Sequence, residues 1–190
     1  MQILLKDVKL VYTGGMTNAG KFGYGYSFIV DKDVIAEKAL TIAKAAKKVT
    51  FSEKELTPTR MLNFMNAKSA TKLQEDAELK DDPSALQDII AHMGANDVLV
   101  GVKAKGRVKA TKSTPIGWFS VADIYIDMYA TEYQGRKFIS RSAAADKITV
   151  KVTKYEAVAA ADAPGFESEE ETPAPADGFA AEQTDSDIPF

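Results

Sequence analysis

Three segments of the chain alternate apolar and polar side chains with a period of two residues. In residues 24–30, 97–110 and 120–130, nearly every second side chain is apolar or aromatic, and most of the residues between them are small, polar or charged. Such alternation is typical of a β-strand that has one face on a core and the other face open. The three segments therefore predict a β-rich body.

The remaining segments narrow the fold class. Further strands are expected at residues 2–13, 137–142 and 147–155. Helices are expected at residues 33–48, where Asp33 can cap the first turn, and in an insertion between strands, at residues 58–66 and 83–93. Five or six strands with one to three helices, and no alternation of strand and helix, predict a small antiparallel barrel or sandwich.

The charges divide the chain into two parts. Residues 156–190 hold ten of the 27 acidic residues and none of the 24 basic ones, so this tail carries −10 and residues 1–155 carry +7. A tail made mostly of Ala, Pro, Gly, Ser, Thr and carboxylates cannot bury enough apolar surface to offset the entropy lost on ordering, so we expect it to be disordered. The basic part, residues 1–155, is expected to form one domain that binds a polyanion.

The segment 97–110 concentrates positive charge on one face. Alternation places Val98, Val100, Val102, Ala104 and Val108 on the inner face. The outward positions carry Lys103, Lys105, Arg107 and Lys109, and Lys112 follows in the next connection. Alternate strand residues are about 6.6 to 6.8 Å apart, which is close to the spacing of phosphates along an extended single strand. This pattern predicts the wall of a cationic groove; the alternative is an edge strand that lysines protect from aggregation.

Aromatic residues supply the second requirement of single-strand binding, because every base has a π-face on which a ring can stack. Trp118 follows the basic segment and is the first candidate. The others are Tyr24 and Tyr26, after a glycine-rich loop that contains Lys21, and then Tyr125 and Tyr129. Phe28 and Phe119 are expected in the core, and the alternative for every ring at strand spacing is a place in the core.

The sequence offers no catalytic constellation, so we expect a binding protein that is not an enzyme and needs no metal or cofactor. There is no Cys, and the single His92 is expected at a helix C-terminus. Residues 15–21 have the spacing of a phosphate-binding loop, but Phe22 stands where Ser or Thr should hold magnesium, and a strand is expected next. Asp123 and Asp127 are separated by about 13 Å along a strand, too far for a two-metal site, so pairing with Lys or Arg is expected. No apolar run is long enough to cross a membrane and no signal peptide is evident, so a cytoplasmic protein is expected.

The last six residues of the tail form a distinct motif. Two acidic residues, Asp185 and Asp187, precede the apolar terminus Ile188, Pro189 and Phe190. This combination suits an apolar pocket with a basic rim. This tip resembles the C-terminal peptide of bacterial single-stranded DNA-binding proteins, Asp-Asp-Asp-Ile-Pro-Phe, at five of six positions. The resemblance implies recruitment of replication and repair proteins such as a polymerase, helicase or nuclease, and Ser186 implies weaker docking.

The body as a whole resembles the divergent single-stranded DNA-binding proteins of bacteriophages. That resemblance implies a barrel of the oligonucleotide/oligosaccharide-binding (OB) type that coats and protects single strands, independent of sequence, during replication, recombination and repair in the host cytoplasm. The tail is expected to compete with DNA for the groove. The alternatives are a binder of duplex as well as single strands, a strand-annealing protein, or a replisome adaptor that binds only protein. The oligomeric state stays open, with a homo-oligomer among the possibilities.

Overall fold

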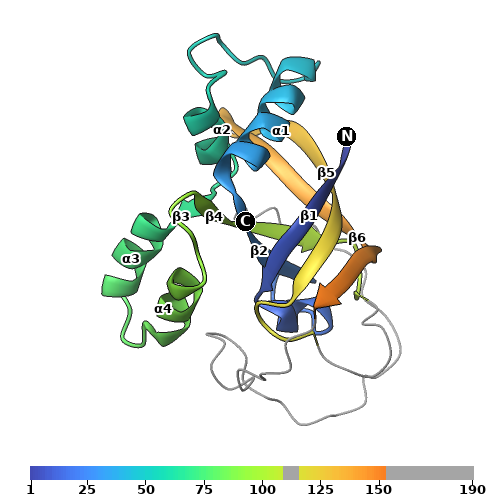
Figure 1. Cartoon of the computed structure of the whole chain (residues 1–190). Helices are drawn as coiled ribbons and strands as arrows, with labels where there is room; N and C mark the ends of the chain where they lie inside the picture. The colour runs from blue at the N-terminus through green and yellow to red at the C-terminus, as the bar shows by residue number, and fades with distance from the viewer. Residues whose placement is uncertain (109–115, 153–190) are drawn as a thin grey trace.

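A five-stranded barrel forms the centre of the computed structural model, which describes residues 1–108 and 116–152 (Figure 1). The elements in chain order are β1 (Gln2–Val11), η1 (Thr13–Met16), β2 (Gly25–Asp31), α1 (Lys32–Ala45), α2 (Pro58–Phe64), β3 (Lys68–Ser69), α3 (Ala70–Glu78), α4 (Ser84–Ala91), β4 (Asp97–Ala104), β5 (Val121–Tyr133) and β6 (Arg136–Val152). The β-rich body that the alternation predicted is confirmed.

The strand pairing closes the sheet into a barrel of the OB type. β1 lies between β2 and β5, β6 lies between β5 and β4, and β4 pairs back to β2. The two-residue β3 adds to one end of β4. A five-stranded barrel with this pairing has OB-fold topology, so the predicted fold class is confirmed. One pair differs from the antiparallel expectation, because β4 and β6 run parallel where Lys103 faces Ser142.

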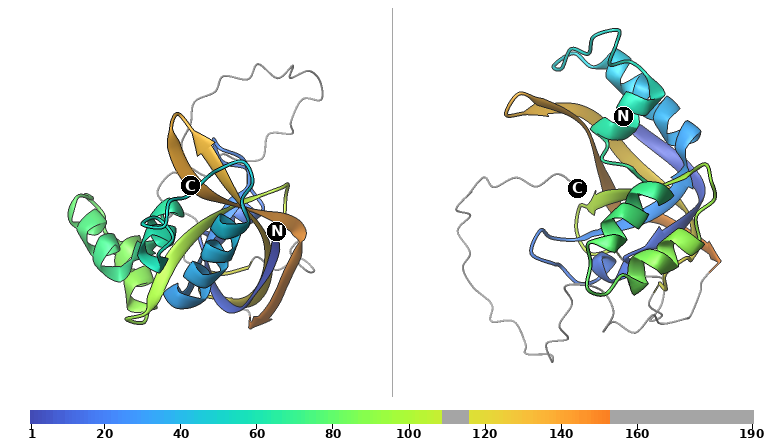
Figure 2. Two further views of the ribbon diagram at one scale, coloured as in Figure 1. Left: turned by 90° about the horizontal axis from the view of Figure 1, so that it is seen from above. Right: turned by 90° about the vertical axis from the view of Figure 1, so that its left-hand side faces the viewer.

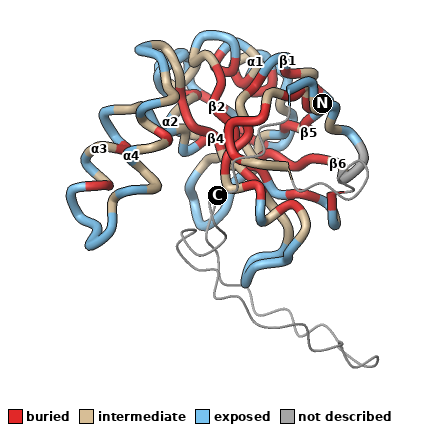
Figure 3. Tube along the Cα trace, turned by 60° about the horizontal axis from the view of Figure 1, so that its bottom comes forward, coloured by how far each residue is buried: buried red, intermediate tan, exposed pale blue. Residues whose placement is uncertain are grey.

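The inward positions of the alternating segments meet in one core. Phe28, Val100, Ile124 and Ile126 are each 0% exposed, and Figure 3 shows buried residues concentrated along the strands of the barrel. The core position expected for Phe28 is confirmed. Alternation alone therefore assigned the inner faces of β2, β4 and β5 correctly, since only one side of each strand can face a closed barrel.

The helices lie in the connection between β2 and β4, and the structure contains four α-helices in its described residues, where one to three were expected. The additional helix is α3, which buries only Leu73 and Ala77 and so has no long apolar stripe in the sequence. The predicted capping residue of α1, Asp33, is wrong by two positions. The cap is Asp31, whose carboxylate accepts hydrogen bonds from the backbone amides of Asp33 and Val34 at 2.8 and 3.1 Å. Within the ranges described, no helix combines the length and apolarity needed to cross a membrane.

The α3–α4 pair covers part of the outer face of β2 and β4. Ile29 and Leu99 point outward from these strands and are buried with Leu73 of α3 and Ile89 of α4 in a second, smaller core. Figures 1 and 2 show the pair on one side of the barrel, with its far end projecting away from the strands. The rest of the β2–β4 outer face is therefore left for another contact.

Two strands differ from their expected bounds. The basic segment, residues 97–110, leaves the sheet after Ala104. Gly106 adopts a positive φ of +115, and the amide of Val108 then donates to the carbonyl of Met16 in η1. The two strands expected at 137–142 and 147–155 form the single strand β6, in which a register shift opposite Ile124 and Ile126 takes up extra residues.

The turn between β5 and β6 is tied to the connection between α1 and α2. The Nζ of Lys137 donates to both carboxylate oxygens of Glu55, at 3.0 and 2.8 Å. This hydrogen bond and the Ser52 amide lower the pKa of Glu55 to about 2. The ion pair therefore holds the far end of the β5–β6 hairpin in place.

Candidate nucleic-acid interface

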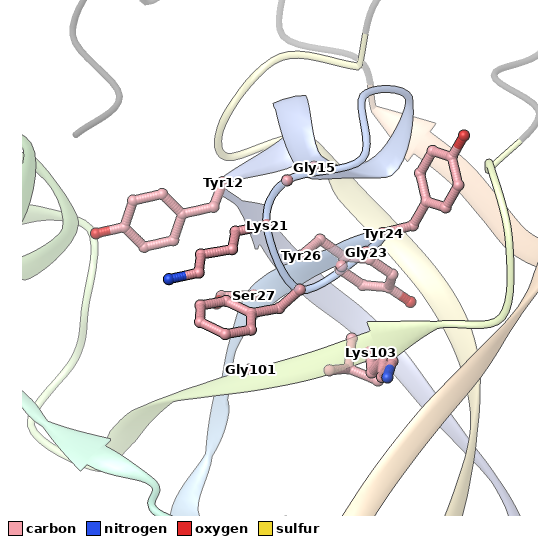
Figure 4. A pocket seen from close by; sticks show the side chains of 13 residues that line it. Tyr12, Gly15, Lys21, Gly23, Tyr24, Tyr26, Ser27, Gly101 and Lys103 are labelled. Carbon is pink, nitrogen blue, oxygen red and sulfur yellow. The ribbon is translucent and has the colours of Figure 1, made fainter. Parts of the chain in front are cut away.

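A pocket of about 330 Å³ lies between the β1–β2 loop and the open part of the β2–β4 outer face. Figure 4 shows the loop residues on one side of the space and β4, with Gly101 and Lys103, on the other. This volume is at the small end of the range for ligand pockets, roughly 300 to 1,000 Å³. In OB folds, the face of these two strands and the adjoining loops bind oligonucleotides.

The floor of the pocket is made of small residues from two paired strands. Gly25 and Ser27 point outward from β2, and the register sets Ser27 opposite Gly101 and Gly25 opposite Lys103. A Cβ atom at Gly25 would lie 3.0 Å from the Val102 carbonyl oxygen. Because these positions carry little or no side chain, a ligand can approach the backbone of the sheet closely.

The β1–β2 loop presents its cation and its ring at a tight turn. The amide of Gly20 donates to the carbonyl of Gly23 at 3.1 Å, and the amide of Gly23 donates back at 2.9 Å. Lys21 and Phe22 lie between them; the ring of Phe22 is 42% exposed and has the Lys21 Nζ 5.7 Å from its centroid. Gly15 allows the start of the loop to pack closely against Gly25, since a Cβ atom at Gly15 would lie 2.3 Å from the Gly25 carbonyl oxygen.

Two cations border the pocket from opposite sides. Lys21 comes from the loop and Lys103 from the outward face of β4, and both are exposed. Neither forms an ion pair with another residue in the described part of the chain. Both charges are therefore available to an anionic ligand such as a phosphate.

The prediction that four cations form a continuous row on one strand is wrong. Lys103 is the one member that lies within β4, and the chain turns at Gly106 before Arg107, which is exposed beyond the strand. Lys105 follows β4 directly, and its Nζ pairs with Asp127 Oδ2 on β5 at 3.1 Å. Lys109 and Lys112 lie outside the described residues.

Trp118 does not present a stacking face. It is 7% exposed, and its ring packs edge-on against Tyr12 and Phe119, with centroid distances of 4.9 and 6.1 Å. The core under α3 and α4 covers the ring, so this structure offers no open ring face for the predicted stacking on bases. The core position expected for Phe119 is confirmed at 5% exposure.

The two tyrosines of the β2 segment have different surroundings. Tyr24 is half-buried at the pocket, whereas Tyr26 is 4% exposed, and burial raises the pKa of its hydroxyl. The Tyr26 hydroxyl has no hydrogen-bond partner in the described part of the chain. Tyr26 lines the pocket, but its ring belongs to the barrel core, so this structure offers no open ring face for the predicted stacking on bases.

The structure thus brings together four of the predicted residues, Lys21, Tyr24, Tyr26 and Lys103, in one pocket. Tyr125 and Tyr129 are exposed on β5, outside the pocket. The pocket residues that the prediction missed include Tyr12, Phe22, Gly25, Ser27 and Gly101. Small residues at outward positions of β2 and β4 could have indicated an open surface in the sequence. Only the pairing of β2 with β4 shows that these positions adjoin each other.

Other polar residues have the structural roles expected of them. Asp123 pairs with Lys151 at 2.7 Å, which lowers the pKa of Asp123, and Asp127 pairs with Lys105. His92 is the C-cap residue of α4 and stacks on Phe119 with ring centroids 3.5 Å apart. Among the residues that the structure describes, no cluster of three or more His, Asp or Glu side chains could hold a metal ion.

Comparisons with known proteins give a likeness of fold. No protein family matches the sequence, and no curated protein is similar to it. The single-stranded DNA-binding protein from bacteriophage Enc34 is similar in structure, with 14% identity, a TM-score of 0.44, and coverage of 85% of this chain and 88% of that one. A C-terminal truncation of that protein, and its complex with single-stranded DNA, give the same identity and TM-score and each cover 77% of this chain and 86% of the other.

Proposed function

We propose that the domain formed by residues 1–155 binds single-stranded DNA in the groove between the β1–β2 loop and the outer face of β2 and β4. The observation that carries the proposal is the combination in one pocket of a small-residue floor, an exposed Phe22 ring, and two cations, Lys21 and Lys103, that form no ion pair within the described residues. Aromatic platforms beside cations are the elements of single-strand binding.

Each part of the groove has a distinct role in this proposal. A base lies against the Phe22 ring, while Lys21 and Lys103 contact the phosphates on either side of it. The glycine floor lets the strand approach the sheet without displacing side chains. Stacking on a ring does not depend on which base is present, so the binding is expected to be independent of sequence and strongly salt-dependent.

Replacement of the Phe22 ring tests the groove directly. Phe22→Ala should lower the affinity for oligo-dT by roughly 5- to 150-fold, because base stacking on an aromatic side chain is worth about 1–3 kcal/mol. Fluorescence anisotropy with a labelled oligonucleotide measures the change. Phe22→Tyr keeps the ring and should bind nearly as well as the natural chain.

One result of that experiment would contradict the proposed groove, and a competition experiment tests the alternatives. Equal affinity of Phe22→Ala and the natural chain for oligo-dT would show that the pocket does not hold a base. Competition with duplex of the same length separates single-strand binding from the alternative of general nucleic-acid binding. A chain that binds neither form would instead support a protein-binding adaptor.

We also propose that residues 156–190 act as an arm whose acidic tip recruits replication or repair proteins. The support is the sequence of the tip, with Asp185 and Asp187 before Ile188, Pro189 and Phe190. The same −10 charge should compete with DNA for the groove. This competition is the reason to expect an effect of the arm on DNA affinity as well as on partner binding.

Deletion of residues 156–190 should raise the affinity for oligo-dT at low salt, and the gain should shrink as salt screens the charges. A salt titration of the natural and truncated chains, side by side, measures both effects. An arm in which all ten carboxylates are replaced by amides serves as the control and should behave like the deletion. An unchanged affinity after truncation would exclude competition by the arm.

A further inference from the structure

Three exposed tyrosines line the outward face of β5. Tyr125, Tyr129 and Tyr133 are 40%, 50% and 36% exposed, and they are four residues apart on one strand. We propose that this tyrosine row is a second track for the single strand, which leaves the groove and continues along β5 to the β5–β6 turn. The inference rests on the proposed function and assigns the groove a longer binding site.

The strand register connects the groove to the tyrosine row around the barrel. Gly25 in the pocket faces Lys103, Lys103 faces Ser142 of β6, and Ser142 faces Asp127 of β5. Asp127 is the outward residue between Tyr125 and Tyr129. A single strand that passes Lys103 therefore has to cross only β6, at one level of the barrel, to reach the first two tyrosines.

The acidic side chain at the crossing, Asp127, is paired with a lysine. Ser142 is 7% exposed, and its hydroxyl has no hydrogen-bond partner within the described residues. Lys105 covers the carboxylate of Asp127, and its own side chain is 60% exposed. Asp123, the next outward acid on β5, is held by Lys151. Asp123 and Asp127 thus each have a lysine partner, which weakens their repulsion of phosphates; Lys151 is shared between Asp123 and Asp7.

The spacing of the rings favours nucleic acid over a protein partner. Along β5, Asp127 and Thr131 occupy the outward positions between the tyrosines, so neighbouring tyrosines are about 13 Å apart. A protein interface needs a contiguous apolar patch at its centre, which this row does not form. Rings spaced in this way are suited to stacking on separate bases, and their hydroxyls tolerate solvent when no strand is bound.

The end of the row is held in a defined place. Gln134 in the β5–β6 turn donates to the Tyr133 hydroxyl at 2.9 Å, and Lys137 anchors the hairpin to Glu55. A fixed ring loses less conformational entropy when a base stacks on it than a free one does. The Tyr133 end of the row is therefore a fixed part of the proposed binding surface.

The length dependence of binding tests the row apart from the groove. The full chain and the triple variant Tyr125→Ala, Tyr129→Ala and Tyr133→Ala are titrated with oligo-dT of about 5 and about 15 nucleotides, near the two ends of the site sizes known for one OB fold. On the short oligonucleotide, which the groove alone can hold, the two proteins should bind equally. On the long one, the triple variant should lose at least about tenfold in affinity, because several bases lose their stacking partner.

The control is the triple Tyr→Phe variant, which keeps the rings and should match the natural chain on both lengths. Equal affinity of the Ala variant and the natural chain for the long oligonucleotide would overturn the row as a DNA track. An equal loss on both lengths would also overturn it, with far-ultraviolet circular dichroism and thermal melting to detect unfolding. If sedimentation shows that the Ala substitutions dissociate an oligomer while long-oligonucleotide affinity is unchanged, the row is a contact between copies of the chain. Failure of the natural chain to bind either length would instead refute the proposed function.

Discussion

Reversal of the two groove charges, Lys21→Glu with Lys103→Glu, should reduce the affinity for oligo-dT by more than about 25-fold at 0.1 M salt. Loss of two phosphate contacts lowers the slope of log affinity against log salt by about 1.4 on a single strand, which corresponds to that factor at 0.1 M. Repulsion between the new carboxylates and the phosphates adds to the loss. Titrations at several salt concentrations give both the affinity and the slope.

The matched control is Lys47→Glu with Lys48→Glu, which changes the net charge equally at two exposed lysines after α1. The control should lose much less affinity, and its salt slope should stay near that of the natural chain. If both variants lost the same affinity, the protein would attract DNA through its overall charge and the groove would have no special role. Lys105→Ala should have a smaller effect than Lys103→Ala, since Lys105 already pairs with Asp127.

Trp118→Ala should lower the free energy of unfolding by about 3–5 kcal/mol, the usual cost of removing a buried aromatic side chain. The ring lies in the second core, in contact with Tyr12 and Phe119, and its removal leaves a cavity under α3 and α4. Urea denaturation followed by far-ultraviolet circular dichroism measures the change. At a temperature where the variant stays folded, its affinity for oligo-dT should remain close to that of the natural chain.

Trp118→Phe is the control, because it retains a ring at the site and should destabilise the fold much less. The two binding results separate the structural role of Trp118 from a stacking role. If Trp118→Ala stayed folded but lost oligo-dT affinity as Phe22→Ala is expected to, then Trp118 would contact DNA despite its burial. If its stability were unchanged, the packing described for the second core would be wrong.

Much of the barrel could be predicted because alternation reports directly on burial. In β5, the inward residues Ile124, Ile126 and Met128 are all 0% exposed, and the outward residues Tyr125 and Tyr129 are the exposed ones. The pairing of Asp123 and Asp127 with lysines was also predictable, since outward carboxylates on a basic domain find cations nearby. Strand existence and facing were thus local properties.

The end of the basic strand was not predictable in the same way. Residues 97–110 keep the same alternation throughout, yet β4 stops at Ala104. Gly106 adopts a positive φ and Val108 turns to pair with Met16, a residue from a distant part of the chain. The sequence pattern does not reveal this turn, because Val108, which lies beyond the turn, is buried like the inward residues of the strand.

The sequence by itself determined the inner and outer face of each strand, the charge division between residues 1–155 and 156–190, and the candidate cations and rings. Only the tertiary structure decided which outer faces are open. Trp118 is buried in the second core with residues of α3 and α4, which are distant from it in sequence, whereas Phe22 lies on the β1–β2 loop and is 42% exposed. Periodicity reports which side of a strand faces the core, but what covers the other side depends on contacts between segments far apart in the chain.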